Sequence, residues 1–223
     1  MIKLVFFDMA GTVIDENNIV YRTLYEVILQ FRFQVTYDDV ILHGAGKEKY
    51  QALSDILLRQ PKPCSIEVQQ NIYKEFLIKL EEAYSIFEVR PMEFALDVIY
   101  ELRQKKTLVA LSTGYNRTTA TFLLEKLGWV KHKEYDLLLT ASDVNKSRPA
   151  PDMIKKGMQL LAIKDSKYVA KVGDSTIDIL EGKNAECGIT VGVTTGAHNE
   201  AQLLLANPDY ILTSLQFLPN LLR

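Results

Sequence analysis

Three side chains that could take part in catalysis or ligand binding stand at the ends of apolar runs in this sequence. Asp8 follows the run at residues 4–7, while Thr113 and Asp174 come at the ends of two later runs. An unbroken apolar run without a helical period indicates a strand buried on both faces. Ligands of open α/β sheets bind at the carboxyl ends of such strands, although an Asp there can also simply start a turn. We therefore expect these three side chains to meet at one edge of a parallel sheet.

The residue types at this edge suit phosphoryl chemistry. Asp8 can act as a nucleophile toward a phosphoryl group if the negative charge of that group is neutralised. Asp174 and Asp178 offer carboxylate oxygens one helical turn apart, a hard-ligand set suited to magnesium, and Asp178 would also be favoured in the first turn of a helix. Thr113 supplies a hydroxyl donor and Arg148 a positive charge, which together can hold phosphoryl oxygens.

These residues resemble the four-part signature of the haloacid dehalogenase superfamily. The matching pieces are D-x-x-G-T at 8–12, the hydroxyl of Thr113, R-P-A-P at 148–151 and G-D-S-x-x-D at 173–178. The resemblance implies that Mg²⁺ is bound by Asp8, the carbonyl of Ala10 and Asp174, and that Asp178 lies nearby and supports the metal site from outside these direct ligands. The candidate substrate-binding residues are Gly11, Thr12, Gly44, Gly114 and Tyr115.

Position 10 separates this chain from most of that superfamily. Phosphatases of the superfamily usually carry a second Asp there, which protonates the leaving group, whereas this chain has Ala10. A methyl group cannot transfer protons, and general acid catalysis typically contributes about a hundred- to ten-thousandfold. D-x-A-G-T instead resembles the phosphonoacetaldehyde hydrolase (phosphonatase) branch, which cleaves a carbon–phosphorus bond.

That branch uses a lysine outside the α/β core to form a Schiff base with the aldehyde. Lys47 stands at the corresponding G-x-x-K spacing after Gly44 and is the candidate. Met9, His43 and Tyr50 stand where the branch carries Trp, Met and His, so the substrate is left open. The alternative for Lys47 is a solvated surface lysine.

Residues 15–88 differ in pattern from the rest of the chain, because their apolar residues recur at helical spacing. Three amphipathic helices are expected there, the last two separated by a turn at Pro61 and Pro63. We predict that this range is an inserted all-α (C1-type) cap domain. Since it leaves and re-enters the core near Asp8, it can cover that site and exclude water.

The remaining ranges, 1–14 and 89–223, alternate apolar strands with helices. Such alternation predicts an α/β core domain with a Rossmann-like parallel sheet and helices on both faces.

The composition is that of an ordinary globular protein, with 48% hydrophobic and 24% charged residues and a net charge of -2. This small charge gives no electrostatic reason to expect nucleic acid or an anionic membrane as a partner. No apolar run approaches membrane length and Asp8 leaves no room for a signal peptide, so a cytoplasmic location is expected. Cys64 and Cys187 lack metal-ligand spacing and are expected to be reduced thiols.

The leading hypothesis is a magnesium-dependent, phosphonatase-like hydrolase that acts on a small phosphonate or phosphorylated metabolite through an aspartyl-phosphate on Asp8. One alternative is a phosphomonoesterase similar to phosphoglycolate phosphatase, in which another group replaces the acid missing at Ala10. A second alternative is a non-catalytic protein that binds a phosphate ligand. The choice between a monomer and a homodimer stays open.

Overall fold

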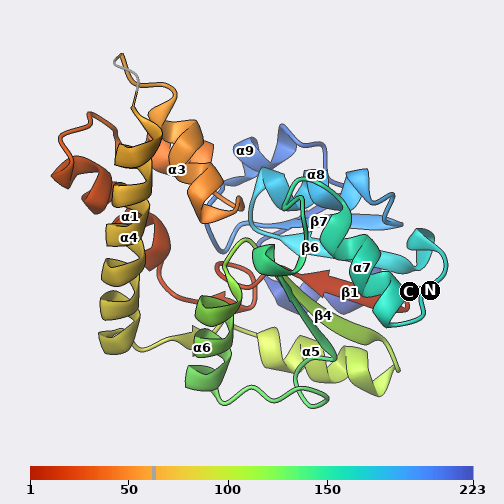
Figure 1. The fold of residues 1–223 in the computed structure, drawn as a ribbon. Helices are drawn as coiled ribbons and strands as arrows, with labels where there is room; N and C mark the ends of the chain where they lie inside the picture. Colours follow the sequence, from red (N-terminus) through yellow and green to blue (C-terminus); the bar gives the residue numbers. More distant parts are fainter. Residues whose placement is uncertain (62–63, 223) are drawn as a thin grey trace.

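A six-stranded sheet forms the centre of the computed structural model, which describes residues 1–61 and 64–222 (Figure 1). The strands lie in the order β5-β4-β1-β6-β7-β8, and each neighbouring pair is parallel. Their bounds are β1 Leu4–Phe7, β4 Leu108–Thr113, β5 Leu137–Thr140, β6 Val169–Gly173, β7 Ile189–Val193 and β8 Tyr210–Leu212. The predicted parallel sheet is confirmed.

Helices cover both faces of the sheet, as predicted. Successive side chains of a strand point to opposite faces, so Phe6 packs with α7 on one face while Phe7 lies on the face covered by α5 and α10. The bounds of the helices outside the 15–88 range are α5 Ala95–Gln104, α6 Arg117–Leu127, α7 Asp152–Leu160, α8 Thr176–Asn184, α9 Glu200–Leu204 and α10 Leu218–Leu221. Three short 3₁₀ helices complete this part: η1 Ala141–Asp143, η2 Ser166–Tyr168 and η3 Leu215–Phe217.

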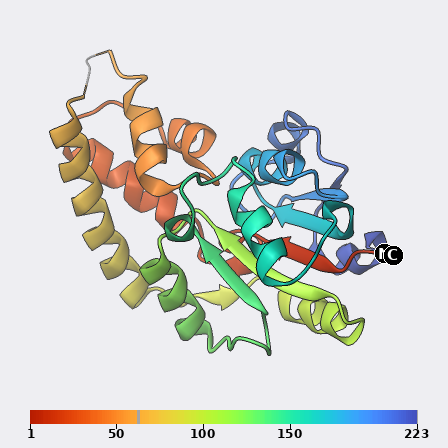
Figure 2. The ribbon, with the colours of Figure 1, turned by 45° about the vertical axis from the view of Figure 1, so that its right-hand side comes forward.

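Four helices gather beside the sheet, as Figures 1 and 2 show from two directions. They are α1 Ile19–Gln30, α2 Tyr37–Gly44, α3 Lys49–Leu57 and α4 Ile66–Ile86. The three predicted helices correspond to α1, α3 and α4, whereas α2 was not predicted. Helix α2 begins at a capping box in which Thr36 and Asp39 satisfy each other's backbone N–H groups. Lys62 and Pro63, in the predicted proline turn, lie outside the described residues.

Two short strands join these helices to the sheet. Strand β2 Ile14–Asp15 pairs in antiparallel fashion with β3 Arg90–Pro91, so the chain leaves and returns at one place, just after Asp8. One hydrophobic cluster continues from Phe7 in the sheet to Leu24 in α1. The arrangement supports an inserted cap, and the boundaries of the two predicted domains stay a prediction.

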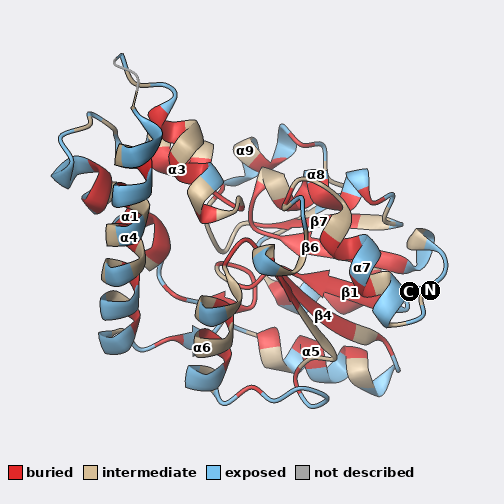
Figure 3. Ribbon diagram, viewed as in Figure 1, coloured by how far each residue is buried: buried red, intermediate tan, exposed pale blue. Residues whose placement is uncertain are grey.

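Burial follows this architecture. Strands β1, β4, β6 and β7 are almost entirely buried, while α4 turns an exposed face outward along its length (Figure 3). Cys64 and Cys187 are free. Within residues 1–61 and 64–222, every helix is too short or too polar to cross a membrane.

Candidate active site

The site lies at the carboxyl ends of the three central strands. Strand β1 pairs with β4 on one side and β6 on the other, so Asp8, Thr113 and Asp174 come to the same edge. Asp178 joins them from the first turn of α8. Oxygen atoms of Asp8, Asp174 and Asp178 lie within 4.8 Å of one another, and all three side chains are buried. The structure thus brings together the acids that the sequence singled out.

Arg148 links two of these acids from the loop before α7. Its Nη1 donates to Asp8 Oδ1 at 2.6 Å and to Asp178 Oδ1 at 2.5 Å. Burial alone would lower the pKa of Arg148, but the charges of Asp178 and Asp8 hold that pKa above its ordinary value. The guanidinium is therefore a permanent cation beside Asp8, where it can neutralise a bound phosphoryl group.

Lys171 is a second buried cation that the sequence analysis did not single out. It lies in β6, fully buried, with Nζ at 3.0 Å from both Asp178 Oδ1 and Glu181 Oε2, and it donates to Ser112 Oγ at 2.8 Å. A lysine inside an otherwise apolar strand was the available signal, because an unpaired buried ammonium is too costly to persist.

Negative charge exceeds positive charge in this cluster. Among the described residues, four buried acids (Asp8, Asp174, Asp178 and Glu181) cluster with two buried cations, Arg148 and Lys171. Burial, followed by repulsion from the neighbouring acids, raises the pKa values of Asp8 and Asp174. A bound divalent cation would remove this excess of two negative charges, so the donor set fits magnesium.

The hydrogen bonds indicate which acids are available to a metal ion. Both oxygens of Asp178 are engaged, Oδ1 by Arg148 and Lys171 and Oδ2 by the Ser175 hydroxyl. Burial alone would raise the pKa of Asp178, but these two cations hold it below its ordinary value. By contrast, no donor among the described residues contacts Asp8 Oδ2 or Asp174 Oδ1. Asp8 and Asp174 are thus the better ligands, while Asp178 fixes the surrounding cations.

Glycines allow the core loops to approach one another closely. Gly11 has a φ of 79°, and a Cβ there would lie 2.3 Å from Asp174 Oδ2. The hydroxyl of the neighbouring Thr12 is buried without a hydrogen-bond partner among the described residues. Thr113 Oγ1 accepts from the backbone N–H of Tyr115 at 3.2 Å, which leaves the proton of this hydroxyl for another acceptor.

The loop between α2 and α3 reaches down onto the core loops. A Cβ on Gly46 would lie 2.2 Å from Ser175 Oγ, and one on Gly114 would lie 2.4 Å from the carbonyl oxygen of Lys47. Any other residue at position 46 would also be strained, because the φ of Gly46 is 75°. The backbone N–H of Gly46 donates to the Tyr21 hydroxyl at 3.0 Å. The helical segment is therefore closed over the site in this structure.

Lys49, at the first position of α3, brings an amine to this interface. Its side chain is buried, and Nζ donates to the carbonyl of Lys47 at 2.9 Å and lies 5.2 Å and 5.1 Å from the ring centroids of Tyr21 and Tyr115. Burial, followed by repulsion from Arg148, lowers the pKa of Lys49 to about 8. This amine can be partly neutral at physiological pH, and a neutral amine is the nucleophilic form.

Lys47 and Gly44 make contacts with α3. The Lys47 ammonium pairs with Asp55 at 2.5 Å, and within the described residues no ion pair joins it to the Asp8 cluster. Gly44 ends α2 and packs against Ala52 and Ile56 in α3. The physical reason is the turn at Gly46, which sends the side chain of Lys47 toward α3. The predicted roles of Lys47 and Gly44 stay predictions, and Lys49 is a second candidate for the amine.

A signal for Lys49 was present in the sequence. Lys49 precedes Ala52, Leu53 and Ile56 at the spacing of one helix face, and all four are buried. A lysine that continues the apolar face of a helix is unusual, because its charge must be compensated or its pKa lowered.

Comparisons with known proteins agree with this geometry. A family model described as haloacid dehalogenase-like hydrolase matches residues 5–193. The chain belongs to this hydrolase family. Phosphonoacetaldehyde hydrolase of Bacillus cereus is 26% identical over 209 residues, which cover 88% of this chain and 77% of that protein. The Latilactobacillus sakei enzyme of the same name is 28% identical over 207 residues, covering 86% and 75%.

Solved structures of other haloacid dehalogenase-like hydrolases share the fold. A phosphonoacetaldehyde hydrolase-like protein from Oleispira antarctica superposes with a TM-score of 0.85 at 20% identity, covering 99% of this chain and 91% of that one. A predicted phosphoglycolate phosphatase from Haemophilus somnus gives a TM-score of 0.82 at 15% identity, covering 100% and 98%. The predicted Rossmann-like core is thus the core of this hydrolase family.

Substitution of Asp174, just before α8, and of Asp178, in the first turn of α8, should separate metal binding from structural support. Asp174→Ala is expected to weaken Mg²⁺ binding by roughly ten- to a hundredfold or more, because it removes a direct ligand. Asp178→Ala is expected to lower the free energy of unfolding by about 3–5 kcal/mol, because it leaves Arg148 and Lys171 buried without their shared partner. Calorimetric Mg²⁺ titration and urea denaturation of both variants measure the two effects. Equal Mg²⁺ affinities in the two variants would contradict this assignment.

Proposed function

We propose that this chain is a magnesium-dependent hydrolase that cleaves a small phosphonate bearing a carbonyl group, with Asp8 as the nucleophile and Lys49 as the amine that activates the carbonyl. The observation that carries the proposal is the buried Lys49 amine, with its pKa lowered to about 8, brought over the Asp8 site from α3. It occurs in a chain that has Ala10 where a proton-transfer acid would otherwise stand.

The core residues divide the work of phosphoryl transfer. Arg148 holds Asp8 through Oδ1, and Oδ2, which accepts no hydrogen bond among the described residues, would attack the phosphorus. Arg148 and the Thr113 hydroxyl are placed to bind the non-bridging oxygens, where charge builds up in the transition state. Mg²⁺ held by Asp8 and Asp174 would neutralise phosphoryl charge when bound. Attack by Asp8 then forms the aspartyl-phosphate, and water later releases phosphate from it.

Lys49 accounts for the missing acid. A neutral lysine amine adds to a carbonyl two bonds from phosphorus to give a carbinolamine, and uptake of one proton with loss of water leaves an iminium. When Asp8 takes the phosphoryl group, the electrons of the breaking carbon–phosphorus bond flow into this iminium and give an enamine. Protonation of the enamine carbon and addition of water then release the dephosphonylated carbonyl compound and regenerate the Lys49 amine. The leaving carbon therefore needs no proton at the moment of cleavage, and an alanine at position 10 is compatible with the reaction.

The relatives support the same substrate class. The Bacillus cereus and Latilactobacillus sakei proteins carry the name phosphonoacetaldehyde hydrolase. At 26% and 28% identity, these names support a carbonyl phosphonate as the substrate class that we propose for this protein.

A substrate panel tests the proposal. Phosphate release would be measured with phosphonoacetaldehyde, a phosphonate without a carbonyl group and phosphoglycolate, each with Mg²⁺ and with EDTA. We expect Mg²⁺-dependent release from the carbonyl phosphonate alone. Release from phosphoglycolate that survives Lys49→Ala would establish a phosphomonoesterase instead, and tight binding without any release would establish a binding protein.

A further inference from the structure

A buried chain of hydrogen bonds runs behind the Lys49 amine. The Tyr84 hydroxyl donates to Glu16 Oε2 at 2.8 Å and shares a 2.7 Å hydrogen bond with the Tyr115 hydroxyl. Glu16, Tyr84 and Tyr115 are only 1%, 1% and 2% exposed. The three residues come from the β2–α1 connection, the end of α4 and the β4–α6 loop, so the chain joins the helical segment to the core.

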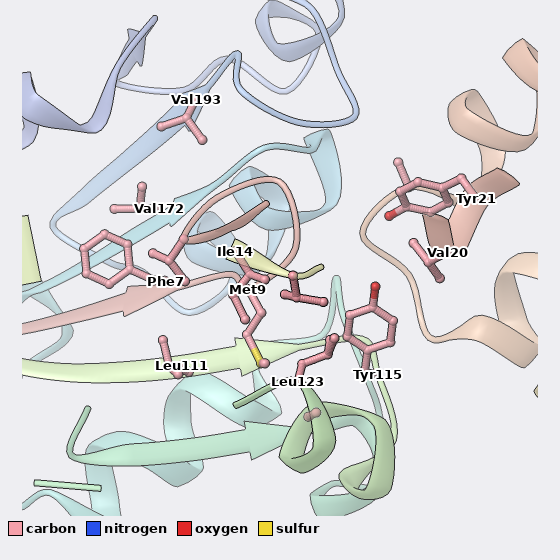
Figure 4. Close-up of a cluster of buried hydrophobic side chains, with 14 of the residues drawn as sticks. Phe7, Met9, Ile14, Val20, Tyr21, Leu111, Tyr115, Leu123, Val172 and Val193 are labelled. Carbon is pink, nitrogen blue, oxygen red and sulfur yellow. The ribbon is translucent and has the colours of Figure 1, made fainter. Parts of the chain in front are cut away.

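This chain of hydrogen bonds ends at Tyr115, whose ring lies beside the Lys49 amine. Tyr115 stands two residues after Thr113, and Figure 4 shows its hydroxyl pointing from the end of β4 toward α1, where Tyr21 lies. The Tyr84 and Tyr115 rings meet edge to face, with centroids 6.5 Å apart. Lys49 Nζ lies 5.1 Å from the Tyr115 centroid, a distance at which a cation and an aromatic face attract. The position of the Tyr115 ring therefore decides the shape of the space around the amine.

Glu16 is also a structural residue, because its Oε2 accepts from the backbone N–H of Val20 in the first turn of α1. A short side chain such as Ser or Asp would cap a helix without burying a glutamate. Burial raises the pKa of Glu16 to about 7, and the hydrogen bond from Tyr84 and the charge of Lys49 oppose that rise. Burying a carboxylate costs free energy, and the hydrogen bonds that Glu16 anchors through Tyr84 to Tyr115 explain its presence better than helix capping does.

We propose that Glu16, acting through Tyr84, is a positioning residue that holds the Tyr115 ring against the Lys49 amine and so sets the direction from which this amine meets a substrate carbonyl. The inference rests on the proposed function of Lys49. It goes beyond that function because it assigns a role to two residues, Glu16 and Tyr84, that no part of the phosphoryl-transfer chemistry requires.

Tyr84→Phe tests the proposal, because it removes the central hydroxyl and keeps the ring. Misplacement of a reacting group costs up to about a hundredfold, so we expect kcat to fall toward that limit with a smaller change in KM. Glu16→Ala should behave likewise. Glu16→Gln, which keeps an oxygen that Tyr84 and Val20 can donate to, should restore most of the activity. Combining Glu16→Ala with Tyr84→Phe should cost no more than the larger single effect, because both break the same chain.

Tyr100→Phe is the matched control. Its hydroxyl donates to Glu134 at 3.1 Å and joins α5 to the segment between α6 and β5, so the variant also removes a tyrosine–glutamate hydrogen bond. Thermal unfolding would be recorded for each variant. A purely structural role predicts lower midpoints with unchanged kcat in both tyrosine variants, and that result would overturn the proposal.

A second readout does not depend on any phosphonate. Formaldehyde and cyanoborohydride methylate neutral lysine amines, and peptide mass spectrometry gives the rate at Lys49. Solvent admitted beside a displaced Tyr115 ring favours the ammonium form, so Tyr84→Phe should slow methylation of Lys49 at pH 7.5 while Tyr100→Phe does not. Equal rates in the two variants would overturn the positioning role. If Lys49→Ala kept full hydrolysis, the proposed function would fail while this comparison would still decide the role of Glu16 and Tyr84.

Discussion

Asp8→Asn is expected to abolish turnover while leaving the fold intact. The substitution removes the anionic oxygen that would attack phosphorus and one of the two best metal ligands, with almost no change in side-chain size. Removing a nucleophile that works as part of a catalytic unit costs roughly ten thousandfold or more in kcat. The amide oxygen can still accept the hydrogen bond that Arg148 now donates to Asp8 at 2.6 Å, so the local packing should survive.

The stability of this variant follows from the sign of the pKa shift. Burial, followed by repulsion from Asp178, raises the pKa of Asp8, which means that the folded protein disfavours its ionised form. Above the folded pKa, ionised Asp8 therefore opposes folding, and a neutral Asn should leave the thermal midpoint at pH 7.5 equal or higher.

Phosphate release and thermal unfolding of purified Asp8→Asn measure both expectations. Asp15→Asn is the matched control, because Asp15 is an exposed acid at the end of β2 whose side chain, among the described residues, accepts a hydrogen bond only from the backbone N–H of Asn17. This control should keep wild-type turnover. Turnover in Asp8→Asn at the level of Asp15→Asn would remove the basis of the proposed mechanism.

The elements that could be predicted from the sequence are those with a strong local pattern. The runs that became β1, β4 and β6 are mostly apolar and almost entirely buried, as helices packed on both sides of a sheet require. Helix α2 has eight residues and its start depends on the reciprocal Thr36–Asp39 bonds, so its hydrophobic period is too short to stand out. Strands β2 and β3 have two residues each and exist only because distant parts of the chain meet.

The residues of the candidate site also differ in how far the sequence predicts their positions. Asp8, Thr113 and Asp174 are attached to strand ends, and the order of the strands brings them together whatever the details of the loops. The lysine at the site depends instead on a single backbone turn. With Gly46 at a φ of 75°, the Lys47 carbonyl lies close to Gly114, and the Lys49 amine donates to that same carbonyl at 2.9 Å. Spacing along the sequence counts residues and carries no information about such a turn.

Replacing Lys49 and Lys47 in turn is the second change with a large expected effect. Borohydride added together with phosphonoacetaldehyde should trap a covalent adduct on Lys49, and Lys49→Arg should lose both the adduct and carbon–phosphorus cleavage. Arginine keeps the positive charge but is never neutral in proteins, so it cannot add to a carbonyl. Lys47→Arg is the matched control, because an arginine can keep the ion pair that Lys47 makes with Asp55.

The pH dependence gives this prediction its sign. An ordinary lysine with a pKa of about 10.4 is neutral in fewer than about one molecule in a thousand at pH 7, whereas the pKa of Lys49 is lowered to about 8 by burial and then by Arg148. The rate of adduct formation should therefore rise through about pH 8 and level off above it, because only the neutral amine attacks. Mass spectrometry of the trapped protein locates the adduct. If the adduct forms on Lys47, or if its rate keeps rising past pH 10, then the amine at the Asp8 site is not the group that acts on the carbonyl.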